Sequence, residues 1–369
     1  MKELGVNSYR FSVEWSEIEP REGYFDEAVI QHYVDVVDEL IKNDITPMIT
    51  LFHFTYPQWF SLRGGFEDSR NISYFVRFSK KIFSVLQGKV KLWCTINEPT
   101  VIMLMGYMLG EFTPGKTDFY LAGVVLRNLL QAHCAVYETL KAQPGGKEAQ
   151  IGIVHAALKF VPRRWWNPIE AIPCAYFTHV KYDAILHFFL TGNFEWYTPY
   201  GLKVSYTNKK AKKSLDFFGL NYYSRAVIGM QMNLERPLDG ICFPGEVMTD
   251  MPYASYPEGL YEAIKDVSRL KVPIYITENG IADCRDDRRA TFIKRYIYSM
   301  SKAIEDGYDV RGYFYWTLTD NFEWSEGFLM SFGLYKVDYK TQKRTLREGS
   351  KAYQDIIART KADKACVRR

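Results

Sequence analysis

The hydrophobic pattern of this chain alternates between two kinds of segment. The first kind is short, rich in β-branched and aromatic residues, and apolar on both faces. This pattern is typical of parallel strands that are covered by helices on each side. It predicts strands at Tyr9–Trp15, Thr46–Phe54, Lys91–Glu98, Gln150–Phe160, Leu215–Tyr223, Pro273–Glu278 and Val310–Leu318.

The second kind is longer and repeats its apolar residues at helical spacing. Glu27–Lys42, for example, places Val29, Tyr33, Val37 and Leu40 on one face. The same periodicity predicts helices at Tyr74–Leu86, Ala122–Leu140, Ala171–Leu190, Gly259–Leu270 and Ala290–Asp306. Strands that alternate with helices in this way form βαβ units, so we expect an α/β protein with a parallel sheet.

Such a sheet is either open or closed into a barrel. No G-x-G-x-x-G motif follows the first strand, so the dinucleotide signature of the open sheet is missing. Polar residues instead collect at the carboxyl ends of several strands, and a (β/α)₈ TIM barrel brings all such ends to one rim, where its active sites lie. These residues are Glu14, His53, Asn97, Glu98, Asn221, Glu278, Asn279 and Trp316. The pattern therefore favours the barrel.

The pattern shows seven strand–helix units, and a complete barrel of this kind has eight. Residues Met1–Val6 have the character of the end of a helix that leads into the first predicted strand. We therefore expect strand 1 and helix 1 of the barrel to be missing from this chain. A start codon placed too late, a fragmentary gene and a decayed non-enzyme each explain this, and the intact site motifs favour the first.

No repeat, low-complexity tract or linker divides the sequence. We expect one incomplete barrel domain over residues 1–358 and a basic C-terminal tail over residues 359–369.

Composition and charge exclude several classes of protein. Hydrophobic residues make up 47% and charged residues 24%, as in ordinary globular chains. The net charge of +4 is spread along the sequence, so no nucleic-acid partner is expected. No uninterrupted apolar run reaches the ~18 residues of a membrane span, so no membrane partner is expected either. The basic cluster Lys209–Lys213 is interpreted as a solvated loop, and nothing in the sequence indicates an oligomeric state.

Cysteine and histidine spacing argues against a metal site. The six cysteines form no C-x-x-C pair, and the six histidines form no H-E-x-x-H motif, so we expect neither a metal nor a cofactor. The sequence also shows no secretory leader, which favours reduced thiols and a cytoplasmic location. Aromatic residues reach 16%, a surplus that suits either a packed core or a platform for sugar rings.

Two glutamates hold the most informative positions. Glu98 lies in the segment Thr95–Pro99 and Glu278 in Ile276–Gly280, each at the end of a hydrophobic strand and just before a turn. Spacing alone leaves two interpretations open. Each carboxylate forms a structural ion pair or loop cap, or the two together cleave a glycosidic bond.

Several motifs around these glutamates occur together and in order. They are YRFSVEW, TLFHFTYPQWF, TINEP, DFFGLNYYS, YITENG and GYFYWTLTDNFEW. This set resembles glycoside hydrolase family 1, the retaining β-glucosidase and β-galactosidase family, from the first predicted strand to Val337-Asp338-Tyr339.

The resemblance implies a role for each matching residue. Glu278 would be the nucleophile and Glu98 the general acid that later acts as the base. Arg10 and Tyr223 match positions that hold the nucleophile, and Asn97 matches the residue that binds the sugar 2-hydroxyl.

Further matches imply the sugar site. His53 would bind the 3-hydroxyl, Trp316 would stack on the sugar face, and Asn221 would support the acceptor side. Glu323 and Trp324 would bind other sugar hydroxyls. Without the resemblance, His53, Trp316 and Trp324 would be interpreted as core residues.

Some positions depart from the family pattern. Phe54 and Thr55 replace a common Trp and Asp, Glu17 stands where Arg is frequent, and Ser331 replaces the usual Arg of an R-F-G segment. The chain keeps Glu323 and Trp324 and lacks the phosphate-gripping residues of 6-phospho-glycosidases, which favours an uncharged sugar.

The predicted function is that of a retaining exo-β-glycosidase, which hydrolyses small-molecule β-glucosides or β-galactosides through a glycosyl-enzyme intermediate. The alternative is a truncated, catalytically impaired carbohydrate-binding or scaffold relative. Transglycosylation, in which an acceptor sugar replaces water, is a third possibility.

Overall fold

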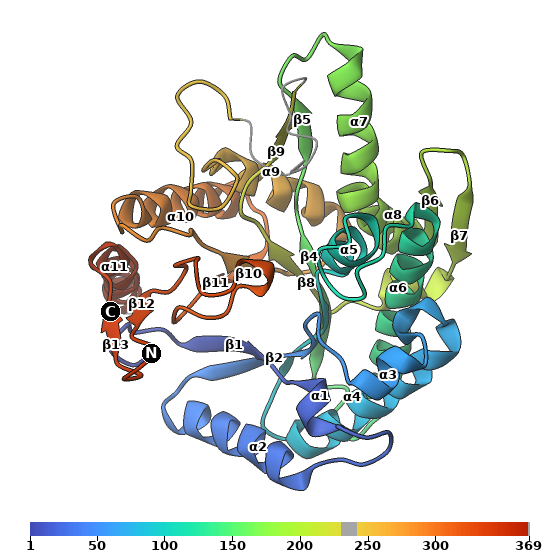
Figure 1. The fold of residues 1–369 in the computed structure, drawn as a ribbon. Coiled ribbons are helices and arrows are strands. Elements are labelled where there is room, and N and C mark those ends of the chain that lie inside the picture. Colours follow the sequence, from blue (N-terminus) through green and yellow to red (C-terminus); the bar gives the residue numbers. More distant parts are fainter. Residues whose placement is uncertain (230–241, 368–369) are drawn as a thin grey trace.

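The computed structural model describes residues 1–229 and 242–367, with side chains up to residue 362. Its centre is a sheet of seven strands in which every neighbouring pair is parallel (Figure 1). In spatial order these are β1 (Ser8–Ser12), β2 (Thr46–Phe52), β3 (Leu92–Asn97), β4 (Gln150–Ala156), β8 (Phe217–Asn221), β10 (Ile274–Asn279) and β11 (Val310–Tyr315). Each falls within a strand predicted from the sequence or extends it by one residue, so the strand predictions and the TIM-barrel fold class are confirmed.

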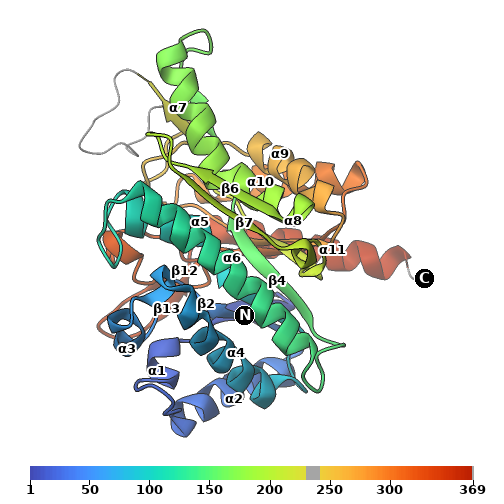
Figure 2. The same ribbon diagram turned by 90° about the vertical axis from the view of Figure 1, so that its right-hand side faces the viewer.

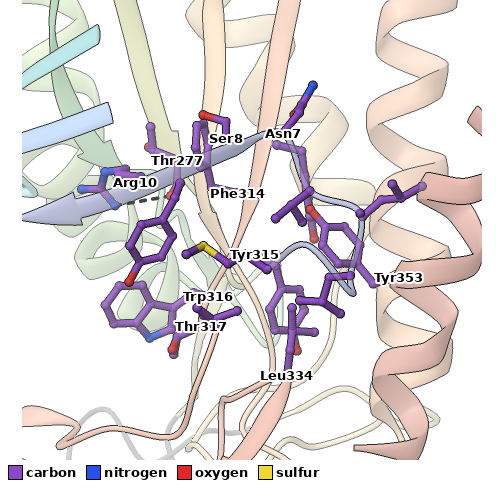
Figure 3. A pocket seen from close by; sticks show the side chains of 18 of the residues that line it. Asn7, Ser8, Arg10, Thr277, Phe314, Tyr315, Trp316, Thr317, Leu334 and Tyr353 are labelled. Atoms are coloured by element: carbon purple, nitrogen blue, oxygen red, sulfur yellow. Dashed lines mark hydrogen bonds between the residues drawn. The ribbon is translucent and has the colours of Figure 1, made fainter. Parts of the chain in front are cut away.

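The sheet curls into a nearly closed barrel, and its two end strands border a seam. Within the described residues, no strand pairing joins β1 to β11. A cavity of about 680 Å³ lies along this seam, lined on one side by residues of β1 such as Tyr9 and Phe11 and on the other by residues of β11 such as Tyr313 and Phe314. Side chains from both strands point toward it in Figure 3. The described chain therefore has the seven barrel strands that the sequence pattern predicts.

Alternating side chains explain why these runs form barrel strands. On β2, Met48 points into the barrel and packs with Cys94, Val154 and Phe217 from neighbouring strands. Ile49, the next residue, belongs to the large core between the strands and the outer helices. Both faces are therefore buried, which explains the continuous hydrophobic character of the strands.

Helices cover the outside of the barrel. Among them, α2, α4 and α6 follow one another along one flank (Figure 2). Two of them begin at an aspartate whose carboxylate accepts backbone N–H groups of the first turn, Asp26 before α2 and Asp118 before α6. The outer helices are α2 (Glu27–Lys42), α4 (Ile72–Leu86), α6 (Phe119–Lys141), α9 (Glu258–Val267) and α10 (Arg289–Glu305).

Among the described residues, α6 is one helix whose length and apolar composition would allow it to cross a membrane. Leu126, Leu129 and Val136 of this helix are fully buried against the rest of the barrel. It therefore has the packing of a core helix.

The helix predicted over Ala171–Leu190 is present, but its repeat changes in the middle. It consists of α7 (Pro168–Thr178), a π-helical segment η4 (His179–Asp183) and α8 (Ala184–Thr191). A π turn adds a residue to the repeat, so a pattern of constant period does not reveal it. This segment carries Lys181, which becomes important below.

The remaining elements lie in the loops and at the end of the chain. The predicted strand Gln150–Phe160 is shorter than expected, because β4 ends at Ala156 and Phe160 begins a separate strand. The short strands are β5 (Phe160–Pro162), β6 (Asn193–Tyr197), β7 (Lys203–Thr207), β9 (Ala226–Ile228), β12 (Tyr335–Val337) and β13 (Arg344–Leu346). The other α-helices are α1 (Trp15–Ile18), α3 (Gln58–Leu62), α5 (Pro99–Met103) and α11 (Lys351–Val367).

Helix α11 runs across residue 358, where the sequence predicted a boundary between domain and tail. The division into a domain and a tail stays a prediction. The basic cluster Lys209–Lys213 forms a single 3₁₀ segment in which only Ala211 is buried, as expected for a solvated loop.

Candidate active site

The two glutamates singled out by the sequence lie at one end of the barrel. Glu98 directly follows β3, and Glu278 is near the end of β10. Both are buried, with exposed fractions of 8% and 4%. A buried carboxyl is costly unless it is paired, hydrogen-bonded or protonated, so the neighbours of each one determine its chemistry.

Glu278 is held by a cation and a phenol. Arg10 on β1 donates from Nη1 to Oε1 of Glu278 at 2.7 Å, and both side chains are 5% exposed. The hydroxyl of Tyr223 donates to the other carboxylate oxygen at 2.8 Å. These hydrogen bonds, one on each oxygen, fix the orientation of the carboxylate.

A chain of hydrogen-bonded side chains connects this carboxylate to residues at the ends of β3 and β2. Arg10 also donates from Nη2 to Oδ1 of Asn97 at 2.7 Å. Asn97 Nδ2 lies 3.1 Å from Nε2 of His53, whose Nδ1 lies 2.8 Å from Ser12 Oγ. Burial and the nearby Arg10 lower the pKa of His53 to about 3, so its ring is neutral. The Asn97 amide donates to Nε2, which therefore leaves the ring proton on Nδ1, directed at Ser12.

Glu98 has different neighbours. Its Oε1 accepts a hydrogen bond from Asn221 Nδ2 at 2.8 Å, and Asn221 is itself held by the Thr277 hydroxyl at 2.7 Å. Burial, and then the negative charge of Glu278, raise the pKa of Glu98, while Lys181 acts in the opposite direction. The surroundings of Glu98 therefore favour its protonated form.

A third carboxyl and two indole rings complete the site. Trp316 donates from Nε1 to Oε2 of Glu323 at 3.4 Å, and burial raises the pKa of Glu323 to about 7. The ring of Trp324 lies 5.6 Å from that of His53, and the ring of Trp316 lies 6.0 Å from it. Both indoles are partly exposed, so they are available to a ligand and are not core residues.

The structure brings the predicted site residues to one rim. Figure 3 shows Arg10 and Trp316 beside the seam cavity, and His53 also lines it. Contacts among the predicted residues form one hydrogen-bonded network of Arg10, His53, Asn97, Glu98, Asn221, Tyr223 and Glu278. The rings of Trp316 and Trp324 lie against His53, and Glu323 accepts a hydrogen bond from Trp316. Among the side chains that the structure describes, in residues 1–229 and 242–362, no three His, Cys, Asp or Glu are grouped to hold a metal ion.

Sequence reasoning missed several residues of this network. Ser12, Thr277 and Thr100 are small hydroxyl residues that carry no distinguishing pattern. Lys181 gave a signal that could have been used, because it is a charged residue inside the apolar helical stretch Ala171–Leu190.

A barrel rim that holds two buried carboxyls, one paired with cationic and phenolic donors and one whose pKa is raised by burial, fits a glycoside-cleaving enzyme. Residues 1–362 match the family model of glycosyl hydrolase family 1. The chain belongs to this family.

Individual relatives agree with this assignment. The chain is 32% identical to a 1,4-beta-D-glucan glucohydrolase of Thermotoga neapolitana, over 97% of this chain and 84% of that protein. It is 30% identical to a beta-galactosidase of Pyrococcus woesei, over 97% of this chain and 83% of the relative. A solved structure of a beta-glycosidase from Pyrococcus horikoshii superposes with a TM-score of 0.86 at 36% identity, covering 97% of this chain and 82% of that one.

These matches confirm the resemblance found in the sequence. The chain is a glycosidase of the retaining β-glycosidase type, built on a TIM barrel.

Proposed function

We propose that Glu278 and Glu98 are the nucleophile and the acid/base catalyst of a double-displacement exo-β-glycosidase, which acts on small-molecule β-glucosides or β-galactosides. One observation carries this assignment: two buried carboxyls share one hydrogen-bonded network, yet one is held by a cation and a phenol while burial raises the pKa of the other. A retaining glycosidase needs this difference, because one carboxyl attacks while the other delivers a proton.

In the first step, the Glu278 carboxylate attacks the anomeric carbon of the substrate. The bond from that carbon to the leaving oxygen breaks, and the proton of Glu98 moves to this oxygen. The Arg10 guanidinium and the Tyr223 hydroxyl orient the attacking carboxylate. The products of this step are a free alcohol and a glycosyl ester of Glu278.

In the second step, water attacks the same carbon and Glu98, now ionised, takes one of its protons. The ester bond to Glu278 breaks and its carboxylate is restored. Because each displacement inverts the anomeric carbon, the released sugar keeps the β configuration.

The other predicted residues would bind the sugar. We assign Asn97 to the 2-hydroxyl, His53 to the 3-hydroxyl and Trp316 to the apolar face of the ring. Glu323 and Trp324 would bind further hydroxyls, and Asn221 would support the acceptor side while it holds Glu98.

A nucleophile variant tests this proposal. Turnover of an aryl β-glucoside by Glu278→Ala should fall by about four powers of ten or more relative to the native chain. Azide should restore part of the rate and give the α-glycosyl azide, because a single displacement inverts the anomeric carbon. Glu195→Ala is a matched control, since Glu195 forms an ion pair with Lys203 on a surface ribbon. Undiminished turnover by Glu278→Ala would reject the assignment.

The seam gives the alternative function a specific basis. Because β1 and β11 are not paired within the described chain, a carbohydrate-binding relative with impaired catalysis is a second candidate. Gluconolactone binding, measured by calorimetry beside aryl glucoside turnover, separates the two. Binding without turnover favours the alternative.

We also propose a cytoplasmic setting, which the free thiols of the described cysteines support.

A further inference from the structure

A buried lysine lies beside the proposed acid catalyst. Lys181 is 2% exposed, and its Nζ donates to the hydroxyl of Thr100 at 2.9 Å. Within the described part of the chain, no carboxylate lies within 4.0 Å of this ammonium. A buried cation without an ion-pair partner is costly, so its retention calls for a physical explanation.

The position of Lys181 supplies part of that explanation. Thr100, its hydrogen-bond partner, is fully buried in α5, the short helix that begins directly after Glu98. Lys181 itself comes from the π-helical segment η4, far away in the sequence. The π turn and the threonine together place a positive charge next to the turn that carries Glu98.

Glu98 and Lys181 have several charged or titratable groups near them, and only some of these can act as a cation for Glu98. Lys181 interacts with Glu98 and with the neutral ring of His155. The groups that face Glu98 from the other elements are Glu278, Arg10, Asn221, Tyr223, Tyr253 and Glu323. Of the two cations near Glu98, Arg10 and Lys181, the first is bound to Glu278. Lys181 is therefore the cation available to Glu98.

We propose that Lys181 is a positioning residue that makes Glu98 able to change role, from proton donor in the first step to proton acceptor in the second. This inference rests on the function proposed for Glu98.

Before the first step, Glu278 is negative, and this charge together with burial keeps the proton on Glu98. After the first step, Glu278 is a neutral ester, so its effect on Glu98 disappears. Burial lowers the pKa of the Lys181 ammonium. Below that pKa its charge remains, and it lowers the pKa of Glu98 against the effect of burial. Glu98 then releases its proton and accepts one from water.

Removal of this charge should change the pH dependence of the enzyme. In Lys181→Met, which keeps the side-chain volume, the basic limb of kcat/KM should move upward by about one pH unit, as expected when an opposite charge near a carboxyl is lost. The acidic limb of kcat, measured with an activated aryl glycoside whose deglycosylation is slow, should also move upward. Glycosyl-enzyme should then accumulate at low pH, where a quenched-flow burst detects it.

Two variants serve as controls. Lys181→Arg keeps the charge and should restore the native pH profile. Lys141→Met removes another partly buried lysine, which pairs with Asp216 at 2.6 Å, away from the rim, and it should leave the profile unchanged. A folded Lys181→Met with native limbs would overturn the proposal.

A second measurement keeps Lys181 in place, in case Lys181→Met does not fold. Electrostatic coupling is reciprocal, so the pKa of Lys181 should be lower in Glu98→Gln than in the native chain, as measured by NMR of its labelled side chain. An unchanged Lys181 pKa would overturn the coupling. Full activity of Glu98→Gln on substrates with poor leaving groups would instead reject the proposed function of Glu98, so the two failures are distinguishable.

Discussion

The ends of β3 and β10 present the same residue type in two different surroundings. At the end of β10, Glu278 accepts a hydrogen bond from a guanidinium on one oxygen and from a phenol on the other. At the end of β3, Glu98 accepts a hydrogen bond from the side-chain amide of Asn221 and is near the negative charge of Glu278. Both carboxyls lie at a strand end, so their different neighbours distinguish them: Glu278 has a cation and a phenol, whereas burial and the charge of Glu278 raise the pKa of Glu98.

In this barrel, the elements that supply the partners of each carboxyl distinguish the two. Side chains from strands that are not neighbours in the sheet meet at the rim. Arg10 of β1 reaches Glu278 of β10, and Asn221 of β8 reaches Glu98 after β3. The second donor to Glu278 comes from the loop after β8, and the cation near Glu98 comes from η4. Variants that change one partner at a time therefore test how much each neighbour contributes to the difference between Glu98 and Glu278.

After loss of the nucleophile, the largest effect is expected from loss of the proton donor. In Glu98→Ala, kcat/KM should fall by about 10²–10⁴-fold for an alkyl β-glucoside, whose leaving oxygen needs a proton. The loss should be much smaller for a dinitrophenyl glucoside, whose leaving group departs as an anion. Steady-state kinetics with both substrates measure the difference. Equal losses on the two substrates would show that Glu98 does not supply the proton.

Removal of the cation beside Glu278 should affect stability as well as rate. Arg10→Met leaves a buried carboxylate without its ion pair, which should lower the free energy of unfolding by about 3–5 kcal/mol. Urea denaturation measures this change. Arg63→Met is a suitable control, because its ion pair with Glu22 is largely exposed and should cost under about 1 kcal/mol. Similar losses in both variants would contradict the view that Arg10 compensates a buried charge.

A smaller loss of kcat/KM is expected when the hydroxyl of Tyr223 is removed. Tyr223→Phe removes one hydrogen bond to the charged Glu278, worth about 1.5–3 kcal/mol, which corresponds to roughly a 10–100-fold loss in kcat/KM. Tyr137→Phe removes a comparable bond to Asp216 away from the rim and should leave kcat/KM unchanged. Kinetics on one aryl glucoside check both variants. A native rate in Tyr223→Phe would mean that Arg10 alone orients the nucleophile.

The third carboxyl of the site should show the smallest effect, and one that depends on pH. Burial raises the pKa of Glu323 to about 7, so it is protonated at low pH and ionises as the pH rises. Glu323→Gln resembles the protonated form. Its KM should therefore match the native value near pH 5 and exceed it by up to about tenfold near pH 9, since an ionised acceptor makes stronger hydrogen bonds. A KM ratio that stays constant with pH would exclude this raised pKa.

Much of the barrel and of its rim was accessible from the sequence. Strand β2, for example, is visible as the apolar run Thr46–Phe54. A strand buried on both faces forms a continuous hydrophobic segment, which can be recognised without knowledge of distant residues. Glu98 and Glu278 were equally visible, since each stands just before a turn at the end of such a run. Their assignment as a pair came from resemblance, because spacing alone left a structural interpretation open.

Other features had no local signal. The π-helical segment η4 breaks the constant period from which the helix over Ala171–Leu190 was predicted. The hydroxyls of Ser12, Thr100 and Thr277 gain their meaning only from the residues that face them. Lys181 was visible as a lysine in an apolar helix, but its partner on α5 was not, because the two are joined by tertiary contact alone.

The amino-acid order by itself determined which segments become strands, which become helices, and which residues stand at the strand ends, because these properties depend on short-range periodicity. Tertiary structure alone decided which carboxyl receives a guanidinium and a phenol, which one has its pKa raised by burial, and which buried lysine lies near the second. Burial and charge separation govern ionisation, and both exist only after distant segments have come together.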